Sequence, residues 1–162
     1  MLDQNKTPIV EPFIIRDFDG FRVGVFGITT LQTKSSSSPD SELIFENEIS
    51  SVKKYIKILK DTYKADIIIA LTHLGSDQES LEQITYIILA KSTSGIDLIV
   101  DGHSHTKFQT PLYVNQTAIV SANEWGKYVG KIIKDKKLVD IQWKDTAITE
   151  QEFVADPKFL KY

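Results

Sequence analysis

Histidine is the side chain in this sequence best suited to metal chemistry, and it occurs only three times. His73 directly follows the apolar run 65–72, and His103 and His105 follow the apolar run 96–100. Neutral imidazole binds zinc, manganese, iron or nickel, and its pKa of about 6.5 leaves it mostly neutral at physiological pH. If the two runs are strands of one open α/β sheet, their carboxyl ends form its ligand-binding edge. The sequence therefore predicts a metal site at that edge.

Each histidine also has a simpler interpretation, as an exposed or hydrogen-bonded residue near a strand end. We favour a metal role because all three gather at one predicted edge. Asp101 and Thr106 are candidates to orient the imidazoles through hydrogen bonds, with ordinary turn capping as an equal alternative. Ser104 lies between them, but Thr106 replaces the second glycine of a G-x-S-x-G nucleophile motif, so we do not expect a catalytic serine.

Strands and a helix are expected to position these histidines. The runs 65–72 and 96–100 are rich in β-branched residues without alternation, which is typical of strands buried on both faces. A capping-box pattern at 76–79 predicts a helix that begins there and ends near 94–95. Strand, helix and strand together predict a crossover unit with parallel strands.

The amino-terminal third predicts a hairpin and a second helix. Two short apolar runs, 13–17 and 22–28, flank a turn that contains Gly20, and the polar stretch 33–41 is expected to be a loop. From about Glu46, apolar residues recur at helical spacing. These residues are Ile49, Val52, Ile56, Leu59 and Tyr63.

The carboxyl-terminal third predicts antiparallel strands, because its apolar residues alternate. The expected strands are 112–114, 117–121, 127–134 and 138–143. Residues 150–162 are expected to be a short helix or an unpacked end. The predicted fold class is α/β, with a strand-helix-strand unit followed by antiparallel strands.

Composition limits the classes of function. The chain has 162 residues, 41% of them hydrophobic, which is enough for one domain with a core. A formal charge of −3 argues against nucleic acid as a partner. With no cysteine, disulfides and thiolate metal sites are excluded. No apolar run reaches the ~18 residues of a membrane span, and the first residues lack an export signal.

Four segments together resemble one enzyme family. The resemblance runs from about Pro12 onward, and its most specific part is a strand-end T-H-L-G followed later by D-G-H-S-H-T. The segments are Val23–Thr30, Leu71–Gly75, Asp101–Thr106 and Ala122–Gly130. They are similar to the 5′-nucleotidase branch of the calcineurin-like metallophosphoesterases. This implies a fold that is the carboxyl half of the family's catalytic β-sandwich, flanked by helices.

The resemblance also implies an activity. Family members use two divalent ions, with zinc, manganese, iron, nickel or cobalt as candidates here, to hydrolyse phosphate esters. By resemblance, His73 and His103 would bind one ion and His105 the other. The implied substrate is a nucleotide or another small phosphate ester, including nucleoside monophosphates and 2′,3′-cyclic nucleotides.

The sequence departs from the family at its amino-terminal side. The family motifs D-x-H, G-D and G-N-H-D/E, which supply the other metal ligands and the catalytic histidine, are absent. Residues 1–149 are therefore expected to be part of a catalytic domain, and residues 150–162 to lead toward a separate carboxyl-terminal domain. We assign no catalytic residue, and expect this chain alone to bind no ion or one ion weakly and to have little activity.

Two functional hypotheses remain open at this stage. In the first, the chain is part of a nucleotide-hydrolysing metallophosphoesterase that needs the family's amino-terminal half. In the alternative, it is a non-catalytic remnant or interaction module with the same half-fold. Either predicts an exposed sheet edge that pairs with the amino-terminal half or with a second copy of the chain. Many family members are exported to the periplasm or cell surface, but the location of this chain is unknown.

Overall fold

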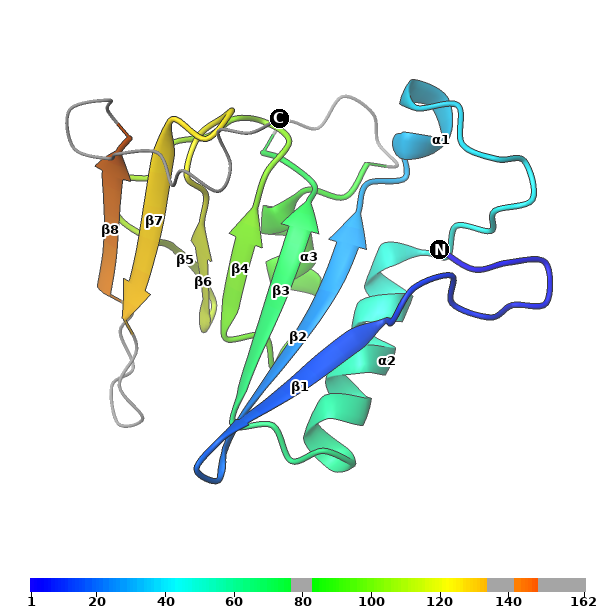
Figure 1. Cartoon of the computed structure of the whole chain (residues 1–162), viewed down its shortest axis with the longest axis horizontal. Helices are drawn as coiled ribbons and strands as arrows, with labels where there is room; N and C mark the ends of the chain where they lie inside the picture. Colours follow the sequence, from blue (N-terminus) through cyan, green and yellow to red (C-terminus); the bar gives the residue numbers. More distant parts are fainter. Residues whose placement is uncertain (77–82, 134–141, 149–162) are drawn as a thin grey trace, which may run out of the picture.

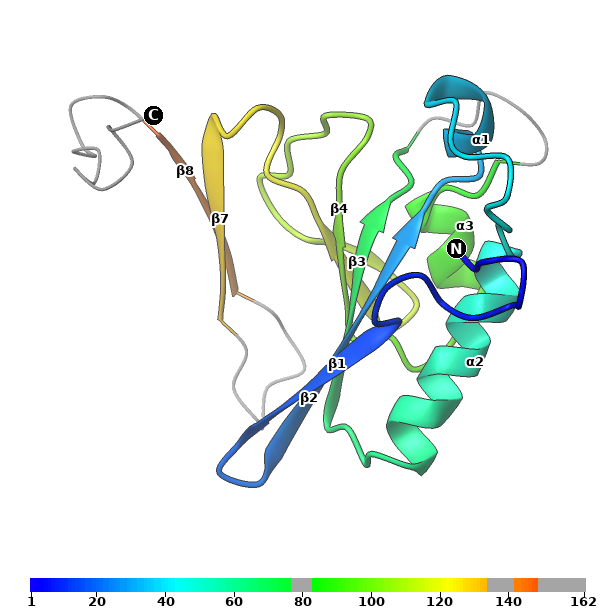
Figure 2. The same ribbon diagram turned by 45° about the vertical axis from the view of Figure 1, so that its right-hand side comes forward.

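The computed structural model describes residues 1–76, 83–133 and 142–148. Its strands form a six-stranded sheet in the order β1-β2-β3-β4-β6-β5 and a separate β7–β8 pair. Helices α2 and α3 cover one face of the large sheet, and the β7–β8 pair lies against the other face (Figure 1, Figure 2). The mixed α/β class expected from the sequence is confirmed. The elements are β1 (Phe13–Phe18), β2 (Phe21–Thr29), α1 (Thr33–Ser36), α2 (Glu48–Asp61), β3 (Ile67–His73), α3 (Tyr86–Ser92), β4 (Leu98–Asp101), β5 (Leu112–Val114), β6 (Thr117–Val120), β7 (Tyr128–Ile133) and β8 (Gln142–Ala147).

The predicted hairpin is confirmed as β1 and β2, which pair antiparallel with Phe18 opposite Phe21. Asp19 and Gly20 between them both have positive φ, at 52° and 83°. That conformation matches the right-handed twist of two strands joined by a two-residue turn. The Asp17 carboxylate accepts a hydrogen bond of 2.7 Å from the backbone N–H of Gly20 and closes the turn.

Helix α2 is confirmed and begins two residues after the predicted start. The side chain of Asn47 accepts a hydrogen bond of 3.0 Å from the backbone N–H of Ser50, which caps the helix. Val52 and Leu59 are fully buried in the main core, with Phe26 of β2. The predicted loop 33–41 differs in one respect, because Thr33–Ser36 form the short helix α1.

The predicted parallel strands β3 and β4 are confirmed as neighbours. The connecting helix, however, begins at Tyr86 instead of Ser76. Thr85 has an extended backbone, and its hydroxyl accepts a hydrogen bond of 3.3 Å from the N–H of Ile88, so the helix is capped there. The rest of the capping-box pattern, residues 77–79, lies outside the described residues.

The prediction of antiparallel structure for the carboxyl-terminal third is only partly right. β6 pairs antiparallel with β5 but parallel with β4. All four residues of β6 are buried, so it is a central strand covered on both faces, where parallel pairing is common. β7 and β8 do pair antiparallel. The predicted start of the last strand, 138–141, and the tail 150–162 lie outside the described residues.

None of the described helices is both long and apolar enough to cross a membrane.

Candidate functional site

The carboxyl ends of β3 and β4 lie side by side, because the strands are parallel with Thr72 opposite Asp101. His73 is the last residue of β3, and His103 follows the end of β4. Their imidazole rings lie 5.0 Å apart between centroids, at an interplanar angle of 70°. Two imidazoles that bind one tetrahedral ion at about 2.0–2.1 Å have centroids roughly 5 Å apart. The spacing of this pair therefore fits a shared ion.

Two glycines let the backbone approach these rings. A Cβ atom on Gly102 would lie 3.1 Å from Nδ1 of His73, and a Cβ atom on Gly75 would lie 2.8 Å from Cδ2 of His103. Gly75 also has a φ of +75°, which side chains with a Cβ rarely adopt. The loops after β3 and β4 can therefore hold the imidazoles together only with small residues at these positions.

Asp101 fixes the turn that follows His73. Its carboxylate is buried and accepts hydrogen bonds from the hydroxyl of Thr72 and from the backbone N–H groups of Leu74 and Gly75, the latter two at 3.0 Å and 2.9 Å. These partners correspond to the turn-capping alternative that the sequence left open. Asp101 thus fixes the backbone of the turn that directly follows His73.

Ser104 and Thr106 connect the loop that follows β4 to the loops that follow β3 and β6. The hydroxyl of Ser104 accepts a hydrogen bond of 3.1 Å from the N–H of Ser76 and lies 2.9 Å from the hydroxyl of Thr106. The carbonyl of Thr106 accepts a hydrogen bond of 3.2 Å from the N–H of Asn123, in the loop after β6. The contacts of Thr106 join the loops after β4 and β6.

His105 points to a different partner from the other two histidines. Its Nδ1 lies 2.8 Å from Oε2 of Glu124, and its ring meets the indole of Trp125 edge to face at 5.8 Å between centroids. No role was expected for Glu124 from the sequence. Glu124 follows β6, and the parallel pairing of β6 with β4 puts it at the same sheet edge. The strand was expected from the sequence, but its parallel pairing was not.

Lys127 holds Glu124 from the other side. Its ammonium lies 2.6 Å from Oε1 of Glu124 and 4.6 Å from the centre of the Trp125 indole ring. The hydrogen bond from Lys127 is the largest cause that lowers the pKa of the Glu124 carboxyl, with a smaller contribution from His105. Glu124 is therefore ionised at neutral pH and has a partner on each oxygen.

The predicted trio of histidines forms a pair and a separate residue. Over 1–76, 83–133 and 142–148, no group of three or more His, Asp or Glu side chains is placed to hold one ion. The pair His73 and His103 supplies two nitrogen donors, fewer than the three protein ligands of an open catalytic zinc site.

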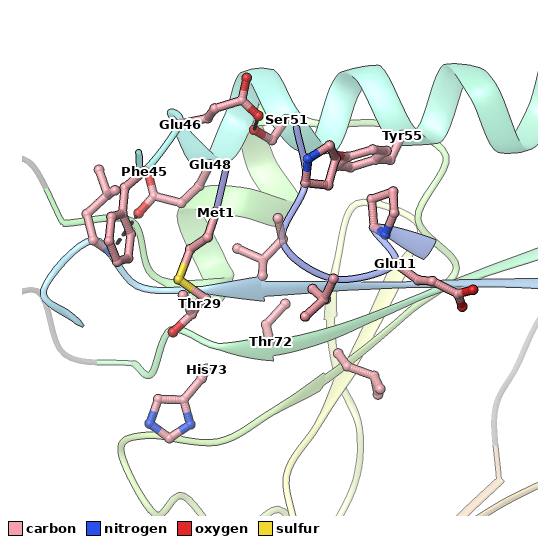
Figure 3. A pocket seen from close by; sticks show the side chains of 17 residues that line it. Met1, Glu11, Thr29, Phe45, Glu46, Glu48, Ser51, Tyr55, Thr72 and His73 are labelled. Atoms are coloured by element: carbon pink, nitrogen blue, oxygen red, sulfur yellow. Dashed lines mark hydrogen bonds between the residues drawn. The ribbon is translucent and has the colours of Figure 1, made fainter. Parts of the chain in front are cut away.

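A groove opens beside His73, at the edge of β2 beyond the end of β1. Its volume is about 420 Å³, and most of its lining is apolar. Figure 3 shows Glu48 and Tyr55 extending from α2 on one side, with Thr29 and His73 on the other. Oε1 of Glu48 accepts a hydrogen bond of 3.1 Å from the N–H of Leu31, whereas its buried Oε2 has no partner among the described residues. The groove gives His73 a partly enclosed neighbourhood.

Comparison with known proteins shows what this arrangement is similar to. The chain is 34% identical over 132 residues to the trifunctional nucleotide phosphoesterase protein YfkN of Bacillus subtilis, an alignment that covers 80% of this chain and 8% of that protein. It is 31% identical over 170 residues to a 5′-nucleotidase of Diplobatis ommata, covering 93% of this chain and 28% of the relative. No protein-family model matches the chain.

A solved structure supports the same relationship at the level of the fold. The crystal structure of the calcineurin-like phosphoesterase YfkN from Bacillus subtilis superposes with a TM-score of 0.70 at 24% identity, covering 90% of this chain and 53% of that chain. The chain spans 8% and 28% of the lengths of the two curated relatives. The expected relationship to 5′-nucleotidases and calcineurin-like phosphoesterases is confirmed, and this chain corresponds to one part of those larger proteins.

Proposed function

We propose that this relative of the 5′-nucleotidases and calcineurin-like phosphoesterases supplies His73, His103 and His105 to a metal-dependent site that hydrolyses nucleotides. The observation that carries the proposal is the contact between the His73 and His103 rings at the carboxyl edge of the sheet. Nucleotide phosphate esters are proposed as substrates because the curated relatives are a nucleotide phosphoesterase and a 5′-nucleotidase.

The donor set fits part of such a site. His73 and His103 have the spacing of two ligands of one ion, and His105 contacts the Glu124 carboxylate, an arrangement suited to a ligand of a neighbouring ion. Bound divalent ions in such sites polarise a phosphoryl oxygen and supply hydroxide as the nucleophile. The residues of this chain hold and orient the imidazoles. Two donors are too few for tight binding, so the isolated chain is expected to bind at most one ion weakly.

Metal titration of the purified chain tests this proposal. Zn²⁺ or Mn²⁺ should bind with a stoichiometry near one in isothermal titration calorimetry, and His73→Ala and His103→Ala should each weaken binding at least about tenfold. Lys6→Ala, a change in an exposed residue of the amino-terminal segment, serves as the control. Equal binding by the wild type and both histidine variants would overturn the metal assignment.

Activity needs a separate measurement. Phosphate release from a nucleoside monophosphate should be slow with the chain alone, because the ligand set is incomplete. Adding the amino-terminal half expected from the resemblance should raise the rate, and His73→Ala or His105→Ala should remove that gain. If the reconstituted wild type and both variants hydrolyse the nucleotide equally fast, the proposed roles of these histidines are wrong.

We also propose that another polypeptide covers the open face of the sheet, which we define by Ile14, Phe18 and Leu71. These side chains lie opposite the helices and are 37%, 61% and 50% exposed. The β7–β8 pair packs against β4, β6 and Ile69 of β3 on that face. Apolar side chains grouped in this way favour protein contact, either with the amino-terminal half or with a second copy of the chain.

A further inference from the structure

We propose that Glu124 is a positioning residue for His105, which it holds in the tautomer that carries its proton on Nδ1 and presents the lone pair of Nε2 to a metal ion. The orientation of His105 stands on the geometry of this chain alone. Its use toward an ion rests on the proposed function.

The hydrogen bond sets the tautomer. An ionised carboxylate is only an acceptor, so across the 2.8 Å between Nδ1 of His105 and Oε2 of Glu124 the proton belongs to the imidazole. In a neutral imidazole with its proton on Nδ1, the Nε2 atom keeps its lone pair free for a ligand bond. Carboxylate-to-histidine contacts of this kind orient imidazole ligands in metal sites and increase their basicity.

The Glu124 carboxylate has a partner on each of its two oxygens. Lys127 occupies Oε1 at 2.6 Å, so that Oε2 remains directed at His105. The Glu124 side chain is only 20% exposed. Trp125 packs against the imidazole ring of His105 and beneath the ammonium of Lys127, so the four side chains form one connected cluster.

The backbone on both sides of the contact is constrained as well. His105, Asn123 and Trp125 all have positive φ, at 52°, 69° and 50°. Residues other than glycine adopt this region less readily, so the surrounding structure must maintain it. A hydrogen bond from the N–H of Asn123 to the carbonyl of Thr106 ties the two loops directly beside the pair.

The tautomer of His105 can be measured without any metal. In long-range ¹H–¹⁵N NMR spectra of the full chain near pH 8.5, where an ordinary imidazole is neutral, wild-type His105 should show a protonated Nδ1 and an unprotonated Nε2. Free imidazole side chains favour the opposite tautomer. Glu124→Ala should shift His105 toward that opposite form, whereas Glu124→Gln, whose amide oxygen also accepts a hydrogen bond, should retain much of the wild-type pattern.

The matched control is Glu42→Ala, a change at an exposed acidic residue outside the site, which should leave the His105 signals unchanged. Backbone amide spectra of each variant establish that the fold is intact. If His105 shows the same tautomer in the wild type and in Glu124→Ala, the positioning role is overturned.

Addition of Zn²⁺ separates this inference from the proposed function. If Glu124 positions a ligand, Zn²⁺ added to the chain together with the amino-terminal half expected from the resemblance should perturb Nε2 of His105, and Glu124→Ala should raise the concentration needed for half of that effect about tenfold. A wild-type His105 that is fixed in the Nδ1–H tautomer but unaffected by Zn²⁺ would overturn its proposed use as a ligand and leave the orientation by Glu124 standing.

Discussion

Among single residues, the Asp101 carboxylate holds the turn that directly follows His73. It accepts hydrogen bonds from Thr72, Leu74 and Gly75 in a buried turn. Asp101→Asn places an amide group against backbone donors and should lower the free energy of unfolding by about 2–3 kcal/mol. Urea denaturation of the variant measures this loss.

The control for that variant is Asp61→Asn, the same change at an exposed residue that pairs with Lys57 on α2. An exposed ion pair of this kind adds little to stability, so Asp61→Asn should lose much less than Asp101→Asn. Equal losses in the two variants would contradict the role given to Asp101.

Gly75 provides a second prediction at the residue scale. Gly75→Ala adds a Cβ atom 2.8 Å from Cδ2 of His103 at a φ of +75°. Gly126→Ala has a similar φ of +68° but meets nothing within 4 Å, so it measures the backbone strain alone. Gly75→Ala should therefore lose roughly 1–3 kcal/mol more stability in urea denaturation than Gly126→Ala, and should shift the NMR signals of the His103 ring. Similar losses with an unmoved His103 would exclude the steric explanation.

The placement of His73 and His103 could be predicted because it follows from strand ends alone. Buried runs without alternation predict parallel neighbours, and parallel neighbours end at one edge. Glu124 could not be found in that way. Its role depends on a hydrogen bond across 19 residues of chain to His105, in loops whose positive φ values leave no periodic pattern in the sequence.

At the scale of elements, the β7–β8 pair contains a close contact between Gly130 and the indole of Trp143. A Cβ atom on Gly130 would lie 2.0 Å from Cη2 of Trp143, whose indole N–H donates to the carbonyl of Phe108 at 2.9 Å. Gly130→Ala should therefore displace the indole, cost about 1–3 kcal/mol, and shift Trp143 fluorescence toward longer wavelength. Both proteins in this comparison carry Trp125→Phe, because the exposed Trp125 also emits.

Gly27→Ala is the control for that variant, because Gly27 also lies in a strand without positive φ and its nearest contact would be a carbonyl at 4.0 Å. We expect its stability to stay within about 0.5 kcal/mol of the parent. An unchanged spectrum in Gly130→Ala would contradict the packing of Trp143 on this strand.

Elements could be predicted where local signals agree with packing. The Asp19–Gly20 turn and the apolar stripe of α2 are such cases, and both elements are present near their predicted bounds. The start of α3 could not be predicted, because Ser76 begins a plausible capping box while Thr85 provides the cap. The parallel pairing of β6 with β4 was missed because the sequence shows only the tight turn that joins β6 to β5. That turn predicts the antiparallel pair but says nothing about the strand on the other side of β6.

For the whole molecule, carboxylates with a lowered pKa contribute to how the free energy of unfolding changes at acid pH. The backbone N–H of Gly20 and then Arg22 lower the pKa of Asp17, and the hydrogen bond from Lys57 lowers the pKa of Asp61. Because the folded-state values lie below the ordinary 3.8, these contributions are present above that pH and are lost as the pH falls below it. Urea midpoints should fall modestly as the pH is lowered below about 4, and Asp17→Asn should flatten that dependence. A steeper dependence in the variant would contradict this sign.

The open face leads to a prediction about association of the isolated chain. Leu71, half exposed on β3 beside Gly27 of β2, should become buried when a second copy covers the sheet. Light scattering coupled to size-exclusion chromatography should then show a mass that rises with protein concentration. Leu71→Lys should weaken association about tenfold or more, because burying one leucine side chain contributes roughly 1.5–3 kcal/mol. Ile9→Lys adds the same charge at an apolar residue of similar exposure, 42%, outside the strands, and should leave association unchanged. A constant monomer mass at every concentration would contradict a second copy as the covering polypeptide. Equal weakening by Leu71→Lys and Ile9→Lys would show that the added charge, and not this face, controls the association.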